Sequence, residues 1–414
     1  MAKTHKPFRE ILKPGANFEF VEHRGRFFAI SLFLILASLA MLFVNKHVLT
    51  SSRGEYLNWT IDFKGGTEMI LWAGDASGKA VPLSSKTARA ALEKAGKESF
   101  DVSDFTFTKT VDGADQSVTG VLIRTPEFGA MAPEKENAVK MAFIESFKDK
   151  NVESPSWSGD RFTLRSNAAI DWNAAKTFFD GQGLELKPWS PEEAVDFSTA
   201  VEGTSDYKMS FYVRGIDAQY QKLLEDASGG NKVYVENVYG VGAKAGAKLR
   251  NDGIKSLFYA MALIMLYLAF RFDIRYAPGA VVALLHDAII VLGAFALSWQ
   301  EVSLTTVAAL LTVIGYSVND SVVIFDRIRE NVARLKDKKF PRVINVSLNE
   351  TLSRSILTSL TLFVVTLMMN VFGTGLVANF AFAMNVGVIA GTYSSVFIAS
   401  PIVLAIHNKY FAKA

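Results

Sequence analysis

The sequence predicts a polytopic α-helical membrane protein with six transmembrane helices, plus an α+β extracytoplasmic domain inserted between helices 1 and 2. Half of the 414 residues are hydrophobic, yet 21% are charged, and the mean hydropathy is +0.20. This composition is too apolar for an ordinary soluble protein and too charged for a chain that lies wholly in a bilayer. The two characters separate along the chain, because long apolar runs flank one long polar segment.

Six apolar runs approach the length of about 20 residues that a spanning helix needs. They lie at 27–44, 254–270, 277–298, 302–325, 355–372 and 376–406. The last run is long enough to bend or to begin with a re-entrant segment. The first run follows a 26-residue leader of mixed charge, and no small-x-small cleavage pattern comes after it. We therefore interpret it as an uncleaved anchor and not as a signal peptide.

The domain boundaries follow from these runs. They are a cytoplasmic leader at 1–26, transmembrane helix 1 at 27–46, the extracytoplasmic domain at 47–253, helices 2–6 at 254–408 with a cytoplasmic loop at 326–353, and a cytoplasmic tail at 409–414. Short strand patterns alternate with helical patterns in the outer domain, which is typical of α+β sheets with helices on one face. Gly65 and Gly66 favour a tight turn there, and such a pair alone indicates no more than a turn.

Lys and Arg concentrate in every second connection between the runs. The leader, the 271–276 turn, the 326–354 loop and the tail carry them, whereas the turns at 299–301 and 373–375 have none. The positive-inside rule then places both termini in the cytoplasm and the large domain outside. The polar segment 48–253 has 24 basic against 30 acidic residues, about −6, and the rest of the chain is about +9. This basic excess indicates topology and not a nucleic-acid partner.

Several classes of chemistry lack the residues that they need. The chain has no Cys and only five His, without the spacing of a zinc site. The sequence also lacks a P-loop, a G-x-S-x-G motif and a dinucleotide fingerprint. We therefore expect no metal, no cofactor and no enzymatic activity, and an energy source other than ATP bound to this chain.

The stretch GYSVNDSVVIFDRIREN at 315–331 places an acid inside an apolar run. An Asp at the centre of a membrane helix costs roughly 2.5–3.5 kcal/mol on translocon-type scales. Helical spacing puts Tyr316, Asn319 and Asp320 on one stripe with Thr305, Ala309 and Thr312, and such small and polar faces pack against other helices. The alternative is an interfacial Asp320 that snorkels to the membrane surface, and the spacing leaves it open.

Three further polar residues accompany Asp320. Asp287 lies near the middle of its run and follows His286, which could equally be a hydrogen-bonded structural imidazole. Arg354 begins the fifth run and is either a topology signal or the counter-charge of Asp320. Intramembrane acids near a base are typical of proton relays. Gly387 and Gly391 form a small-xxx-small face, for which we favour helix packing without a transport role.

Four stretches resemble the SecF family of the bacterial Sec protein-export machinery. They are IDFKGGT, ALLHDAIIVLGAFAL, LLTVIGYSVNDSVVIFDRIREN and VSLNETLSRSILTSLTLF. The resemblance covers the first span, the start of the outer domain and nearly everything from Val238 onward. It implies a pair of related six-span halves with SecD, akin to resistance-nodulation-division transporters. It also implies YajC and the SecYEG channel as partners, a translocating preprotein as substrate, and a place among the lipids of the bacterial cytoplasmic (inner) membrane.

The resemblance further implies that the proton motive force drives the work. Proton passage in the family uses the acid that falls on Asp320 and the arginine that falls on Arg354, and the family's HD motif falls on His286 and Asp287. The outer domain is longer than the family leads us to expect, so we predict an inserted unit at about 120–205. Two alternatives stay open, namely a half-transporter of the efflux class and a membrane scaffold that transports nothing.

Overall fold

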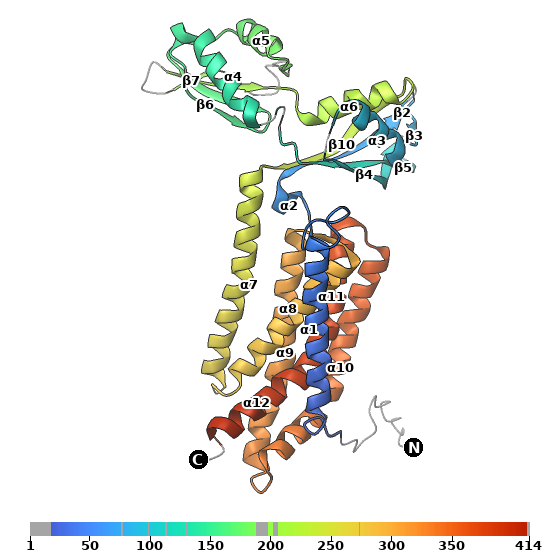
Figure 1. Ribbon diagram of the computed structural model, residues 1–414, viewed down its shortest axis with the longest axis vertical. Coiled ribbons are helices and arrows are strands. Elements are labelled where there is room, and N and C mark those ends of the chain that lie inside the picture. The colour runs from blue at the N-terminus through green and yellow to red at the C-terminus, as the bar shows by residue number, and fades with distance from the viewer. Residues whose placement is uncertain are drawn as a thin grey trace, which may run out of the picture. The chain divides into compact units, whose positions relative to one another are not determined.

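The computed structural model describes most of the chain (Figure 1). The described residues are 18–75, 78–97, 99–111, 114–129, 131, 133–187, 198–201, 206–272 and 274–411. The predicted leader up to residue 17 and the last three residues of the tail lie outside them. The chain divides into two compact units, one of Met1–Thr60 with Leu249–Ala414 and the other of Ile61–Lys248.

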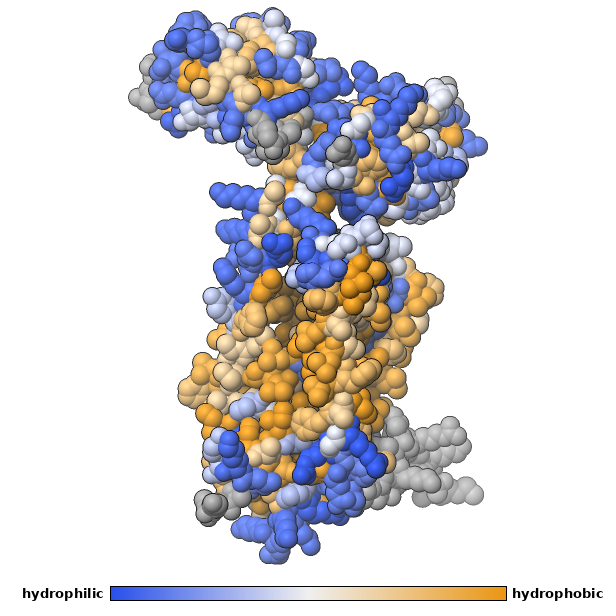
Figure 2. Space-filling model, viewed as in Figure 1, coloured by the Kyte–Doolittle hydropathy of each residue, from blue (hydrophilic) through white to orange (hydrophobic). Residues whose placement is uncertain are grey.

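The first unit is a helical bundle. Its helices are α1 (Arg24–His47), α7 (Ala243–Arg271, which starts in the other unit), α8 (Ala277–Ser298), α9 (Leu304–Arg334), α10 (Phe340–Phe372), α11 (Gly375–Ser394) and α12 (Ser400–Ile406). Within the described residues, six helices are long and apolar enough to span a membrane, with α11 and α12 counted in one span of Gly375–Phe411. Figure 2 shows apolar residues over the middle of this unit and hydrophilic residues towards the turn between α9 and α10. The predicted fold class is confirmed for this part of the chain.

The centre of the bundle is formed by α8, α9 and α11. Half or more of the most apolar part of each of these spans is buried, whereas α1, α7 and α10 leave most of theirs exposed. Helix α1 packs closely on α8 at Gly293. A Cβ added to this glycine of α8 would lie 2.1 Å from the hydroxyl oxygen of Ser38 in α1. The parallel pair of β1 (Asn58–Trp59) and β11 (Glu301–Val302) joins the ends of these elements.

The last span changes its helical form after α11. A π-helical segment at Ser395–Ala399 separates α11 from α12, and a second one follows at His407–Phe411. Pro401 has no backbone N–H to continue the α-helical ladder, which favours such an irregularity. The Ser400 hydroxyl donates a hydrogen bond of 3.1 Å to the carbonyl of Ser395 and so satisfies a carbonyl within the π-helical turn. Segments of this kind often accompany functional sites.

The prediction that residues 326–353 form a loop is wrong, because most of them are helical. Helix α9 continues to Arg334 and α10 begins at Phe340, so only 335–339 forms the turn. Charged residues support these helical ends instead of breaking them. The carboxylate of Glu350 in α10 accepts hydrogen bonds from Arg327 (2.6 Å), Asn331 (2.7 Å) and Arg334 (2.5 Å) in α9, and so joins the two helices beyond their apolar parts.

The second unit contains two antiparallel sheets. The first has the order β10-β2-β5-β4, with β3 beside β2. Its elements are α2 (Ile61–Lys64), β2 (Gly66–Gly74), β3 (Ala80–Val81), α3 (Ser85–Lys94), β4 (Asp101–Val111), β5 (Ala114–Thr125), α6 (Ile216–Ala227) and β10 (Lys232–Val241). Helices α3 and α6 pack against the sheet, and side chains such as Met69, Leu71, Leu92 and Tyr220 form the core.

The second sheet has the order β6-β7-β9-β8 and its own core. Its elements are α4 (Pro133–Ser146), the 3-10 turn η1 (Lys148–Lys150), β6 (Glu153–Ser158), β7 (Arg161–Ser166), α5 (Trp172–Gly181), β8 (Ser198–Ala200) and β9 (Tyr207–Tyr212). Buried rings dominate this core, among them Phe143, Phe162, Phe179 and Phe211. Each sheet therefore buries its own apolar face, and the α+β class predicted for this domain is confirmed.

The predicted inserted unit at about 120–205 needs correction at both ends. Residues 120–125 belong to β5, which pairs with β2 and β4 in the first sheet. Strand β9 at Tyr207–Tyr212 belongs to the second sheet instead. The cores agree with this pairing, because Val121 and Ile123 belong to the first core whereas Met209 and Phe211 belong to the second. Residues 188–197 and 202–205 of that prediction lie outside the described residues.

Gly65 and Gly66 form the turn between α2 and β2. Their φ angles are +80° and +123°, which side chains rarely adopt. A Cβ on Gly65 would lie 2.5 Å from the Cα of Ala243, and one on Gly66 would lie 2.2 Å from the carbonyl oxygen of Thr125. The turn therefore requires glycine at both positions.

Candidate functional site

Asp287 lies at the centre of the bundle and is fully buried in α8. Its Oδ2 accepts a hydrogen bond of 2.7 Å from Ser317 in α9 and one of 2.8 Å from Ser394 in α11. Its Oδ1 lies 3.0 Å from Nδ1 of the neighbouring His286. One carboxylate thus connects the three helices that form the centre of the bundle.

His286 is equally buried and is only partly satisfied. Its Nδ1 faces Asp287, but its Nε2 has no hydrogen-bond partner among the described residues. The ring stacks on Tyr393 of α11, with 6.0 Å between the centroids. Tyr393 in turn donates a hydrogen bond of 2.8 Å to the carbonyl of Phe27 in α1. The imidazole is thus held through Nδ1 and by ring stacking, and it links α8 to α11.

Asp320 lies in α9 and is 3% exposed. The hydroxyls of Ser355 and Ser359 in α10 lie beside its carboxyl group. Its Oδ2 is buried and accepts no hydrogen bond from any described residue. The two intramembrane acids therefore differ, because Asp287 has its oxygens engaged whereas Asp320 keeps one buried oxygen open.

Ser359 connects Asp320 to two further helices. It accepts a hydrogen bond of 3.2 Å from the hydroxyl of Tyr316 in α9. The hydroxyl of Thr392 in α11 lies 2.6 Å from Ser359 Oγ. Asp320 is thus linked to α10 directly through Ser359, and to α11 through Ser359 and then Thr392.

Arg354 is placed near Asp320 but is not paired with it. The guanidinium is close enough to act on the Asp320 carboxyl electrostatically. In the described part of the chain, however, no ion pair within 4 Å joins the two residues. Arg354 is exposed and lines a cavity of about 460 Å³ together with Asp326, Glu330 and Glu350.

The polar stripe predicted on α9 is rotated relative to the buried face. Asn319 and Thr312 are exposed, and the buried side is formed by Ala309, Val313, Ser317, Asp320 and Ser321. Thr312 donates a hydrogen bond of 2.8 Å to the carbonyl of Ala308 in its own helix. A threonine that is satisfied in this way can face lipid, which explains why its position misled the prediction.

Gly387 and Gly391 lie where α11 crosses α9. A Cβ on Gly387 would come within 2.2 Å of a methyl group of Val313, and one on Gly391 would lie 3.0 Å from Cβ of Ser317. The glycines therefore let the two helices approach closely. This approach also holds Ser317 within hydrogen-bonding distance of Asp287.

Five polar residues of the site received no role from the sequence: Ser317, Ser359, Thr392, Tyr393 and Ser394. Each contacts the acids or their neighbours across helices that are far apart in sequence. Hydroxyl residues are common in membrane helices, so only spacing relative to the acids could have indicated them. Ser317, for example, is three residues before Asp320 and shares its buried face.

The polar side chains of the site are of few kinds. Within the described residues no group of three or more His, Cys, Asp or Glu side chains is close enough to hold a metal. The site instead offers two buried carboxyl groups, one imidazole and several hydroxyls. These groups can bind, release and hand on protons.

Comparison with known proteins relates the chain to one family. The family "Protein export membrane protein SecD/SecF, C-terminal" matches residues 219–409. The protein translocase subunit SecF of Cereibacter sphaeroides is 46% identical over 252 residues, which cover 59% of this chain and 77% of that protein. The SecF of Calditerrivibrio nitroreducens is 44% identical over 187 residues, covering 45% and 62%.

Other relatives are matched over less of their length. For the SecF of Koribacter versatilis the identity is 45% over 171 residues, and the match spans 41% of this chain and 42% of that protein. The crystal structure of SecDF from Thermus thermophilus, a translocon-associated membrane protein, is 24% identical with a TM-score of 0.56. That match covers 95% of this chain and 39% of the other and shows that the fold is shared.

The six apolar helices and these relatives identify a multi-pass membrane protein. The match to the Cereibacter sphaeroides protein extends over more than two thirds of that relative. The chain therefore belongs to the SecF family of protein translocase subunits.

Proposed function

We propose that this chain is the SecF half of a proton-driven auxiliary complex, which with SecD promotes translocation and release of preproteins through the SecYEG channel. One observation carries the proposal. Oδ2 of Asp320 is buried and accepts no hydrogen bond from any described residue, and two hydroxyls of α10 lie beside the same carboxyl group. The family membership supplies the translocase role. The proposal needs no bound cofactor and assigns no covalent chemistry to the chain.

Protonation at Asp320 requires little rearrangement of its neighbours. A proton can add to Oδ2 without displacing a hydrogen bond, because that oxygen accepts none from the part of the chain that the structure describes. The hydroxyls of Ser355 and Ser359 can then rotate, since a hydroxyl both donates and accepts. When the proton leaves, the buried charge needs a partner, because an unpaired buried charge is costly.

Arg354 is the available partner for the ionised Asp320. In the structure Arg354 lines a cavity whose other charged side chains are of both signs, Asp326, Glu330 and Glu350 beside Arg271 and Arg327. It precedes Ser355, which already lies beside Asp320. We infer that Arg354 moves from this cavity to Asp320 when Asp320 loses its proton. This exchange moves α10 along α9 and supplies the mechanical step.

Asp287 has a holding role in this mechanism. Its contacts to Ser317 and Ser394 keep α8, α9 and α11 together while α10 moves. Two-state helix arrangements of this kind convert a local change of charge into a displacement. The displaced helices would move the outer domain, which we propose holds the emerging polypeptide against backsliding.

The proposed topology has both termini in the cytoplasm and the outer domain on the far side of the bacterial inner membrane. It is supported by the alternation of Lys and Arg between the connections. SecD, SecYEG and YajC are the proposed partners, and the translocating preprotein is the proposed substrate.

The test is Asp320→Asn in the native host, with Asp337→Asn as the matched control. Asp337 is an exposed acid in the turn that follows α9 and does not line the cavity of Arg354. A secreted protein is pulse-labelled, and its maturation and release are followed while the variant's level is checked by blotting.

We expect Asp320→Asn to accumulate normally and to slow export as strongly as loss of the protein does. Asp337→Asn should export at the wild-type rate. If Asp320→Asn exports normally, Asp320 has no role in proton coupling. Normal export combined with loss of drug efflux would support the half-transporter alternative.

A further inference from the structure

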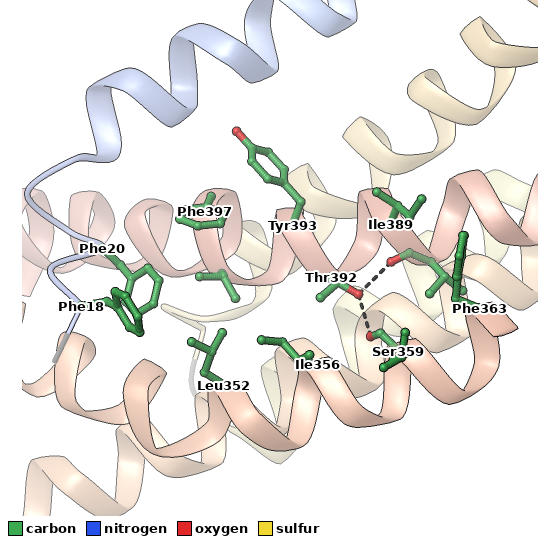
Figure 3. A pocket seen from close by; sticks show the side chains of 13 residues that line it. Phe18, Phe20, Leu352, Ile356, Ser359, Phe363, Ile389, Thr392, Tyr393 and Phe397 are labelled. Atoms are coloured by element: carbon green, nitrogen blue, oxygen red, sulfur yellow. Dashed lines mark hydrogen bonds between the residues drawn. The ribbon is translucent and has the colours of Figure 1, made fainter. Parts of the chain in front are cut away.

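A groove runs along the bundle between α10, α11 and the residues that precede α1. Its volume is about 620 Å³. Ile356 and Ser359 of α10 and Val388 and Thr392 of α11 line its walls. Figure 3 shows Phe18 and Phe20 at one end of this groove and Phe363 towards the other.

The walls of the groove offer nothing to a polar ligand. Its hydroxyls are engaged with one another, because Thr392 Oγ1 lies 2.6 Å from Ser359 Oγ and 2.8 Å from the carbonyl of Val388. The Tyr393 hydroxyl points away and donates to Phe27 of α1. The remaining lining side chains that the structure describes are aliphatic or phenyl groups. An occupant must therefore be apolar.

The mouth of the groove is open to the surroundings of the helices. Leu360 is 49% exposed and Ile389 is 60% exposed, and both line it. These residues belong to spans of a membrane protein, so the surroundings are hydrocarbon. An empty groove would leave its lining atoms without dispersion contacts on one side. The nearest material that can restore those contacts is an acyl chain.

The shape of the groove suits a flexible single chain. Its walls are side chains of two neighbouring helices and of the segment before α1, and it extends from Phe18 and Phe20 towards Phe363 (Figure 3). A methylene chain can bend to follow such walls, whereas a helix with its side chains is a rigid cylinder about 10 Å wide.

The end of the groove is fixed by the protein itself. The amide of Asn349 in α10 accepts a hydrogen bond of 2.8 Å from the backbone N–H of Phe18 and donates one of 2.9 Å to its carbonyl. The amide oxygen of Asn345 accepts one of 3.1 Å from the N–H of Val21. The Phe20 ring packs edge-on against Phe397, 5.7 Å between centroids. This short segment therefore closes one end of the groove whether or not a ligand is bound.

We propose that an acyl chain of a membrane phospholipid binds in this groove as a resident part of the bundle. Selection over bulk lipid comes from close packing and not from the hydrophobic effect, because both environments are apolar. Ser359 lies between the groove and Asp320. The bound chain therefore also separates Asp320 from the surrounding bilayer. The binding itself does not depend on the translocase role.

The test uses the full-length protein in phosphatidylcholine vesicles that contain a small fraction of phosphatidylcholine with a diazirine midway along one acyl chain. After illumination, lipid adducts are mapped by mass spectrometry. We expect adducts to concentrate on groove residues such as Ile356 and Val388, above the level on the lipid-exposed side of α7 at Phe258 and Leu263. Equal labelling of the two surfaces would show annular lipid only and would overturn the proposal.

Two tryptophan variants sharpen the test. Ile356→Trp fills the groove, whereas Leu357→Trp changes the adjacent residue, which is 45% exposed and does not line it. The first should reduce groove labelling to the level of α7, and the second should leave it unchanged. Unchanged labelling in Ile356→Trp contradicts the proposal. If that variant does not fold, Ile389→Trp at the exposed mouth takes its place.

A photo-crosslinking amino acid at position 356, used in native membranes, separates a lipid from a partner protein. An adduct with phospholipid supports the proposal. An adduct with a polypeptide overturns it, because the groove would then receive part of another subunit.

Discussion

At the scale of single residues, two buried aspartates of one bundle have opposite surroundings. Asp287 accepts from Ser317 and Ser394 and faces His286. Asp320 has hydroxyls beside it and one oxygen without a partner. A saturated carboxylate stabilises an arrangement of helices, whereas an unsaturated one can change its partner. We therefore propose a holding role for Asp287 and proton exchange for Asp320.

The holding role predicts that Ser317→Ala and Ser394→Ala each lower the stability of the bundle. Each change removes one of the two hydroxyls that donate to Oδ2 of the fully buried Asp287, while the other donor stays, so we expect the cost of one hydrogen bond, about 0.5–1.5 kcal/mol. Denaturant unfolding of the purified protein in detergent measures the loss. Ser298→Ala is the control, because among the described residues this exposed serine bonds only to the Ala294 carbonyl of its own helix. Losses no larger than that of the control would remove Asp287 from its structural role.

The sequence could indicate the acids but not their hydroxyl partners. An Asp or Arg inside an apolar run is rare and costly, so Asp287, Asp320 and Arg354 stand out without a structure. Ser317 and Ser394 do not stand out, because serine is tolerated on any face of a membrane helix. Their role depends on 2.7–2.8 Å contacts between helices that only the folded chain creates.

At the scale of elements, the contact between α9 and α11 depends on glycine. Gly387→Ala places a methyl group 2.2 Å from a methyl of Val313, and β-branched valine has little rotamer freedom to move away. Overpacking of this kind costs about 1–3 kcal/mol. The expected result is a lower unfolding midpoint in detergent, and the second change Val313→Ala should restore part of it.

Gly315→Ala is the matched control for that substitution. It lies in α9, and a Cβ there would meet no atom within 4 Å. Alanine is a better helix former than glycine by about 1 kcal/mol, so this variant should be as stable as the wild type or more stable. Equal losses in the two variants would mean that glycine acts through helix flexibility and not through close packing.

The connection between α9 and α10 shows how a charged run can mislead. The dense charges of 326–353 resemble a solvated loop, but within them Arg327, Asn331 and Arg334 recur at helical spacing. All three converge on Glu350 of the next helix. The apolar part of each span could be predicted from hydropathy. The helical extensions could not, because they are stabilised by polar contacts between two elements.

At the scale of the whole molecule, the chain combines a helical unit with an outer unit that holds two sheets. The class of both units followed from the division between apolar runs and mixed strand and helix patterns. The border between the sheets did not, because hydropathy gives the same alternation for strands of either sheet. Pairing assigns β5 to the first and β9 to the second.

Separate cores predict that the two sheets lose stability independently. Phe143 is completely buried in the second core, and Leu71 is completely buried in the first. Phe143→Ala should destabilise its sheet by about 3–5 kcal/mol and Leu71→Ala by about 2–5 kcal/mol, through lost burial and a cavity. Hydrogen exchange of the full-length protein reads both sheets at once, through β2 for the first and β7 for the second.

We expect Phe143→Ala to speed exchange in β7 while β2 keeps its wild-type protection, and Leu71→Ala to do the reverse. The reason is that strand pairing does not cross between the sheets in the described residues, so neither ladder depends on the other. Faster exchange in both sheets after either change would show one cooperative outer domain. In that case the second sheet would be an integral part of the first and not an addition to it.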